Sequence, residues 1–230
     1  MSNGFSNQPK ILRGAFVEYG LSLPPLIVCF QFNPETISRS RSLYISVPRG
    51  AQPERGWLSL REYQQREEFI NLIKLREAQD VSVQSESVSF ELRLDATDKL
   101  NDGNPIAQQF GIAPELSTLE LMMYPKGESI LGELVSGLIE GYSFTGKEKP
   151  PIVLFVWGRK RILPINITSM SITEQEFSTD LNPIRATISV SMRVIEGENA
   201  PYKYSKAMKE AMSVLNLANL PEVANVIIPI

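Results

Sequence analysis

The sequence predicts a mainly β fold with a few helices, built as an antiparallel β-barrel or β-sandwich. The evidence lies between Pro150 and Gly197, where three consecutive strands are expected. Residues 152–157 are a continuous apolar run behind two prolines, which is typical of a strand buried on both faces. Residues 185–194 alternate strictly between apolar and polar side chains, which indicates one face on a core and one outside it. Three strands in succession favour an antiparallel meander over a β-α-β unit.

The middle strand of the three is expected over residues 162–172. Ile165 and Ile167 share one phase of its alternation, whereas Met170 and Ile172 share the other. This change of phase predicts a bulge or a bend at Ser169. The joints also fit, because Gly158–Arg161 can close a hairpin and Asp180–Pro183 carries turn-forming residues.

Further strands are expected earlier in the chain, at residues 11–20, 24–30, 43–47 and 82–96. The only cysteine, Cys29, stands in the apolar run VCFQF. An intrachain disulfide is therefore excluded, and a reducing compartment is compatible with the sequence. We expect Cys29 to be a buried, inert thiol.

Helices are predicted where apolar residues recur at helical spacing. Ser59 and Glu62 form a capping box that begins a helix over residues 60–78. Two further helices are expected at 114–124 and 130–141, and a last one follows Ser205 as its cap. The chain then divides into a loose tail (1–10), a β domain with helical insertions (11–197), and a C-terminal helix and tail (198–230).

The composition excludes several kinds of chemistry. The chain has 230 residues and no histidine, so neither a Ser-His-Asp triad nor Cys-His catalysis is available. Phosphate-binding glycine loops are missing, and the acidic residues between Asp95 and Asn104 do not have calcium-loop spacing. Glu174, Glu176 and Asp180 are expected to be solvated or salt-bridged. We therefore predict a protein that is not an enzyme, with no cofactor and no metal.

Charge and hydropathy limit the partners in the same way. A net charge of -3 without a strongly basic block argues against nucleic acid. The short clusters Arg159–Arg161 and Arg39–Arg41 are expected to be solvated hairpin tips or interface charges. The sequence shows no signal peptide, and no apolar stretch is long enough to span a bilayer, so no direct membrane insertion is expected.

Several sequence blocks between Ile11 and Glu196 resemble the N-terminal domain family of contractile injection system tube proteins. They are VEYG, PPLIVCFQFNPETISRS, LELMMYP, PPIVLFVWG, LPINITSMSITEQEF and LNPIRATISVSMRV. The resemblance implies a tail-tube type of fold and a structural role. It also implies a hexameric ring that joins the inner tube to the baseplate hub or spike as an adaptor or tube initiator. The implied partners are other copies, the tube protein, and spike, hub and baseplate proteins. The implied location is the bacterial cytoplasm, within a phage-tail-like particle that is later released or anchored to a membrane.

Longer members of this family carry a C-terminal LysM module, and this chain is expected to be a short member without one. Residues 200–230 are too few and have the wrong pattern for a LysM fold. The C-terminal helix and the apolar tail are candidates to make the contacts that LysM would supply.

The polar face of the strand at 185–194 is the candidate functional surface. We expect its side chains to face the lumen or a neighbouring subunit; they are Arg185, Thr187, Ser189, Ser191 and Arg193. The alternative is a monomeric β-barrel that binds a small ligand or a glycan, which would need polar groups and stacking aromatics in a cavity. Trp57 and Trp157 are the only tryptophans, and Trp157 is expected in the core.

Overall fold

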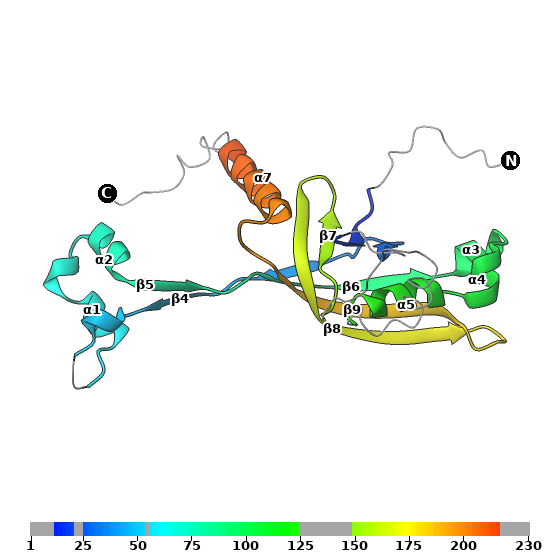
Figure 1. Ribbon diagram of the computed structural model, residues 1–230, viewed down its shortest axis with the longest axis horizontal. Helices are drawn as coiled ribbons and strands as arrows, with labels where there is room; N and C mark the ends of the chain where they lie inside the picture. The colour runs from blue at the N-terminus through cyan, green and yellow to red at the C-terminus, as the bar shows by residue number, and fades with distance from the viewer. Residues whose placement is uncertain (1–11, 21–24, 54–55, 125–148, 217–230) are drawn as a thin grey trace, which may run out of the picture. The chain divides into compact units, whose positions relative to one another are not determined.

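The computed structural model describes residues 12–20, 25–53, 56–124 and 149–216 (Figure 1). The chain forms two compact units, one made of Met1–Ser38 with Val88–Ile230 and the other of Arg39–Ser87. The described residues form a seven-stranded antiparallel sheet that curls into a half-barrel, a separate two-stranded sheet, and several helices. The predicted mainly β fold class is therefore confirmed. Two of the expected segments, the loose tail at 1–10 and the helix at 130–141, lie outside the described residues.

The large sheet has the strand order β2-β1-β7-β8-β9-β6-β3. The strands are β1 (Ala15–Glu18), β2 (Ile27–Cys29), β3 (Ile37–Ser40), β6 (Ser87–Asp95), β7 (Val153–Trp157), β8 (Arg161–Phe177) and β9 (Pro183–Val194). Consecutive antiparallel pairing of β7, β8 and β9 confirms the predicted meander. β8 continues to Phe177, five residues beyond the predicted end, because it remains paired with β9 as far as Pro183.

The predicted irregularity near Ser169 is a β-bulge at Thr168. Ile167 pairs with Met192 and Ser169 pairs with Ser191, so one residue of β8 has no counterpart in β9. The Thr168 hydroxyl donates a hydrogen bond of 3.0 Å to the Ser191 carbonyl. The bulge changes the phase of β8, which allows Ile165 before it and Met170 after it to pack with the same core.

The core lies against one face of the large sheet, and four phenylalanines from different strands and loops meet in it. Their ring centroids are 5.1–6.4 Å apart, which is the range of favourable aromatic pairs. They are Phe16, Phe30, Phe90 and Phe155, all at most 7% exposed.

Two burial predictions for this part of the sheet are wrong. Val153 and Phe155 of β7 are buried, but Leu154 and Val156 are only half-buried, so the strand is fully buried on one face rather than both. Cys29 is exposed, because Val28 takes the inward position of β2. In both strands, buried and more exposed positions alternate. The sequence does not show this alternation, because the residues on both faces are apolar.

Short helices follow β6, namely α3 (Thr97–Asn101), α4 (Pro105–Phe110) and α5 (Ala113–Leu121). The helix predicted at 114–124 is thus confirmed as α5, and it buries Leu116 and Leu119. α4 ends at Gly111, beyond which the Ile112 N–H donates to the Pro183 carbonyl over 2.9 Å. This bond joins the helices to the beginning of β9.

The C-terminal helix α7 (Ala200–Asn216) begins six residues earlier than a cap at Ser205 predicts. The Asn199 side chain accepts the Tyr202 N–H over 2.9 Å and so caps the helix. Ser205, expected as the cap, is instead inside the helix and only 2% exposed. Its hydroxyl donates to the Ile162 carbonyl (2.6 Å) and accepts the Ile162 N–H (2.9 Å), which fixes α7 to β8.

The second unit contains the antiparallel pair β4 (Leu43–Ser46) and β5 (Asp80–Val83). Between them the chain forms η1 (Arg49–Ala51), α1 (Leu60–Gln64), η2 (Glu67–Phe69) and α2 (Leu72–Ala78). The capping box of Ser59 and Glu62 is confirmed. The Ser59 hydroxyl and N–H donate to the Glu62 carboxylate and lower its pKa.

The single helix predicted over 60–78 is wrong, since the chain forms three short helical segments there. Arg66 has an extended backbone, and Asn71 caps a new helix by accepting the Ile73 N–H over 2.9 Å. Phe69 turns back onto Tyr63, with ring centroids 4.8 Å apart. The strand predicted over 82–96 is also divided, because β5 and β6 belong to different sheets.

We predict that Gly111→Ala lowers the free energy of unfolding by about 2–4 kcal/mol. Gly111 has φ +58°, and a Cβ there would lie 2.1 Å from the Pro183 carbonyl oxygen. The measurement is urea unfolding followed by circular dichroism. The matched control is Gly103→Ala, where φ is +71° but no atom lies within 4 Å, and where about 1 kcal/mol is expected. Equal losses in the two variants would contradict the close approach to β9.

Candidate functional site

The candidate site is the outward face of the three neighbouring strands β8, β9 and β6. In β9 the predicted alternation is confirmed, because Ala186, Ile188, Val190, Met192 and Val194 are all buried. The five side chains chosen from the sequence occupy the opposite phase, and each is half-buried or exposed. β6 repeats the pattern, with Glu91, Arg93 and Asp95 on the polar side and Leu92 and Leu94 in the core. One side of this sheet is therefore apolar and the other polar.

Small polar side chains face one another along the β8–β9 pair. After the bulge, the cross-strand partners on the polar face are Ser169 with Ser191, Ser171 with Ser189, Thr173 with Thr187, and Gln175 with Arg185. Directly opposite residues on one face of an antiparallel pair are close enough to touch. The face thus carries a ladder of short hydroxyl side chains, with larger charged groups at its ends.

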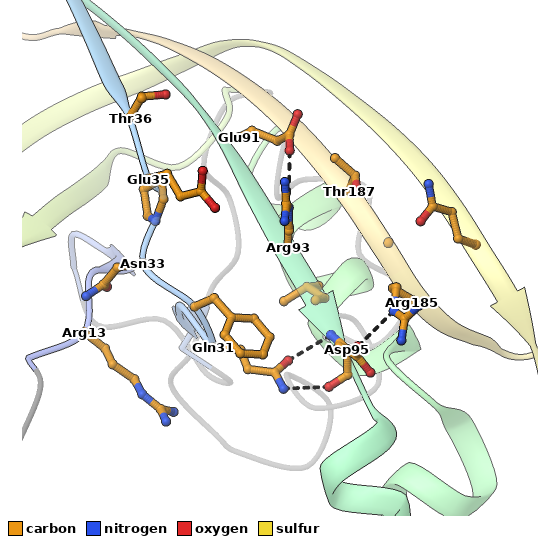
Figure 2. A pocket seen from close by; sticks show the side chains of 15 residues that line it. Arg13, Gln31, Asn33, Glu35, Thr36, Glu91, Arg93, Asp95, Arg185 and Thr187 are labelled. Carbon is orange, nitrogen blue, oxygen red and sulfur yellow. Dashed lines mark hydrogen bonds and ion pairs between the residues drawn. The ribbon is translucent and has the colours of Figure 1, made fainter.

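One end of this face is hollowed into a pocket of about 1150 Å³ (Figure 2). Its walls come from the segment 31–36 on one side and from β6, β9 and β8 on the other. Arg185 and Thr187 line it, whereas Ser189, Ser191 and Arg193 lie outside it on the same face. The structure therefore brings two of the five predicted residues to the pocket and leaves three on the open sheet.

Arg185 is the central cation of the pocket. Its Nε lies 2.8 Å from Asp95 Oδ2, and its Nη1 lies 2.7 Å from Glu176 Oε1. The hydrogen bond that Arg185 donates to Asp95, together with the two negative charges, raises the pKa of Arg185 further, so it remains protonated. Glu176 has a backbone φ of 54°, which few non-glycine residues adopt. The expectation that Glu176 is a salt-bridge partner is confirmed.

Asp95 shows opposing effects on its pKa. Partial burial raises the pKa, but hydrogen bonds from Thr97 and from Arg185, together with the charge of Arg185, outweigh it. The net result is a lowered pKa, so the carboxylate is ionised at neutral pH. The Thr97 N–H donates to Asp95 Oδ1 over 2.8 Å, which joins the beginning of α3 to the same charge cluster.

Gln31 holds the other wall of the pocket in place. Its side-chain amide donates to the Asp95 carbonyl (2.6 Å) and accepts the Asp95 N–H (2.9 Å). The side chain thus makes the two bonds that a paired strand residue would make. Residues 32–36 then pass β6 without strand pairing. The gap between this segment and the polar face is where the pocket opens.

The pocket carries both signs of charge on its wall. Arg93 and Glu91 form an exposed ion pair of 3.5 Å, and Phe32 is the one aromatic ring among the described lining residues. Neither tryptophan lines the pocket. Trp157 packs against the core, as predicted, with its ring stacked on Phe155 at 6.1 Å. Such a wall offers polar and ionic contacts rather than the stacking surface that a glycan site needs. Among the described residues, no group of acidic or cysteine side chains could hold a metal ion.

The two short basic clusters have different surroundings. Arg159 and Lys160 are exposed in the β7–β8 turn, as predicted for a hairpin tip. Arg39 and Arg41 instead flank Glu86, a carboxylate only 3% exposed. Both arginines are exposed, as expected for solvated charges, and they also pair with a buried carboxylate, which needs a cation beside it. No local pattern indicates this pairing, because Glu86 is 47 residues from Arg39.

Asp95, Gln31 and Glu176 complete the site but were not chosen from the sequence. Asp95 continues the polar phase of the alternating strand β6, and this phase is the signal that could have found it. Gln31 has no comparable signal, because its partner is 64 residues away.

Taken together, the two-faced sheet and the internally paired charges define a mainly β structural subunit. The family model of contractile injection system tube proteins matches residues 24–200. The chain therefore belongs to the contractile injection system tube protein family, whose members are structural components and not enzymes. No curated protein matches the chain. Within the described residues, none of the helices is both long and apolar enough to cross a membrane.

We predict that Asp95→Asn reduces the acid sensitivity of the fold. Because the pKa of Asp95 is lowered in the folded state, its stabilising effect is complete above the unfolded-state pKa of about 3.9. It is lost as the pH falls through the folded-state pKa. The free energy of unfolding should therefore decrease less steeply below about pH 4 in the variant than in the wild type. Urea unfolding at a series of pH values measures this slope.

The control for this experiment is Asp98→Asn, which changes an exposed aspartate three residues away. This variant should keep the wild-type slope. An Asp95→Asn variant with an unchanged slope would show that the Arg185 ion pair does not contribute to acid unfolding.

Proposed function

We propose that this chain forms a ring, of six copies, that joins the inner tube of a contractile injection system to its baseplate hub or spike. The coarser role, a structural tube-family component of a phage-tail-like system, follows from the family. The observation that supports the finer role is the two-faced β8–β9 pair. One face closes a core, and the other presents small hydroxyl groups to the outside.

A ladder of serines and threonines suits the wall of a wet channel. Short hydroxyl side chains hydrogen-bond readily to water and offer little apolar surface to which cargo could adhere. At the pocket end, Arg185 is already paired with Asp95 and Glu176 within the subunit. In the proposed ring, Thr187, Ser189 and Ser191 face the lumen or the contact between subunits, with Arg185 and Arg193 at the two ends of this row.

The open sheet supports assembly as well. β2 and β3 are the edge strands of the seven-stranded half-barrel. Unpaired edges invite association with other chains, and a head-to-tail ring covers them by cyclic symmetry. The ring proposal therefore explains why the sheet is an open half-barrel with two edge strands. A closed monomeric barrel would have no such edges.

The proposed neighbours are the tube protein on one side of the ring and the hub, spike or baseplate proteins on the other. Nucleic acid is not among them. The proposed location is the bacterial cytoplasm, within a particle that is later released or membrane-anchored. α7 carries the exposed side chains Met212, Val214 and Leu215, and we propose that it makes baseplate contacts.

The ring proposal is tested by purifying the tagged full-length chain from cells that make such particles and imaging the product by negative-stain electron microscopy. We expect sheathed particles with the tag at one end. Monomers alone, from cells shown to contain particles, would contradict the ring and favour the ligand-binding barrel.

We further predict that Ser189→Leu with Ser191→Leu reduces assembly or firing of the particles. Two leucines would place apolar bulk on the hydroxyl ladder, opposite Ser171 and Ser169. Particle counts and the fraction of contracted particles measure the effect. Ser117→Leu, at an exposed position of α5 outside the proposed contact surfaces, is the control for added surface apolarity. Wild-type assembly and firing in the double variant would refute the lumen or interface assignment.

A further inference from the structure

The ribbon of β4 and β5 has one apolar face that its own strands cannot bury. Leu43 pairs with Val83 and Ile45 pairs with Val81, so these four side chains share a face, which we call the ribbon face. They are 42–56% exposed. Tyr44, Ser46, Asp80 and Ser82 occupy the opposite face. A two-stranded ribbon is marginally stable alone, and exposed apolar patches of this kind mark interaction sites.

The first unit of the same chain has a second apolar sheet face. On β2, β1 and β7, the side chains of Phe16, Val28 and Phe155 enter the core. The residues between them point to the other side in two cross-strand rows, which we call the outer face. They are Ile27, Val17 and Leu154 in one row, and Cys29, Ala15 and Val156 in the other. Ile27 is 50% exposed, and Cys29 is also exposed.

We propose that the ribbon face of one copy packs on the outer face of the next copy. This inference rests on the proposed ring. A head-to-tail ring requires each subunit to carry two different complementary surfaces, one for each neighbour. This chain carries two such surfaces, both mainly aliphatic and both made of strands. Each copy then makes the contact twice, once through each face.

The geometry of sheet packing favours this pairing. Two sheets that pack face to face lie about 10 Å apart, with side chains from the inner faces interdigitated. The ribbon face provides branched aliphatic side chains, and the outer face provides small residues, Ala15 and Cys29, beside larger ones. Alternation of small and large side chains is what allows two faces to interdigitate. Because every copy of the chain carries both faces, a second copy supplies an outer face for each ribbon face.

The only cysteine of the chain allows a direct test, because Cys29 lies on the outer face and is exposed. Two tagged versions of the full chain are co-expressed in particle-forming cells, the wild type and a Val83→Cys, Cys29→Ser variant. Facing sheets are about 10 Å apart, beyond the roughly 7 Å that a disulfide can bridge. A short bis-maleimide is therefore applied to the purified particles. We expect a covalent pair that carries both tags on a denaturing gel.

The matched control is Ser82→Cys with Cys29→Ser, since Ser82 is the neighbouring residue on the polar face of the ribbon. It should give several-fold less of the pair at equal particle yield. Rings visible in the microscope with no more cross-linking from position 83 than from position 82 would overturn this inference and leave the ring in place. Cross-linking from position 83 to a different particle protein would overturn it as well. The absence of any ring would refute the proposed function itself.

Discussion

The antiparallel pairing of β8 with β9 is the interaction on which the rest of the molecule depends. The two strands are 17 and 12 residues long, and they carry the core on one side and the hydroxyl ladder on the other. β7 extends the sheet beyond β8, and β6 extends it beyond β9. α7 is fixed to β8 through Ser205 and Ile162, and the short helices are joined to the beginning of β9 through Pro183. Each neighbouring element thus takes its position from this pair.

The polar face combines two strategies for exposing polar groups. Some of its charged residues are neutralised within the subunit, as when Arg185 contacts both Asp95 and Glu176. Its small residues remain available, because serine and threonine hydroxyls can bond to water or to a partner at little cost. Surface ion pairs contribute little stability on average. The value of the Arg185 cluster therefore lies in positioning, since Asp95 also fixes Gln31 and the wall formed by residues 31–36.

The sequence predicted those features whose signal is local. Alternation in β9, the phase change in β8 and the capping box each depend on residues a few positions apart, and all three were correct. The bonds between Gln31 and Asp95, and between Arg39 and Glu86, join residues 64 and 47 positions apart. No periodicity records such pairings. Cys29 was misjudged for a different reason, because an apolar residue of either phase looks buried when both faces of a strand are apolar.

The bulge at Thr168 has a mechanical consequence. A regular strand pair can slip by two residues and still keep its apolar and polar sides, because the side-chain period is two. Here the extra residue of β8 breaks that translational symmetry, and the Thr168 hydroxyl is tied to the Ser191 carbonyl. Sliding β8 along β9 would move the bulge opposite a regular stretch and bring the wrong phase onto the core. The bulge therefore resists sliding of β8 along β9. A force that pulls the two strands in opposite directions along their length loads all of their hydrogen bonds at once, and this is the direction in which the bulge resists movement.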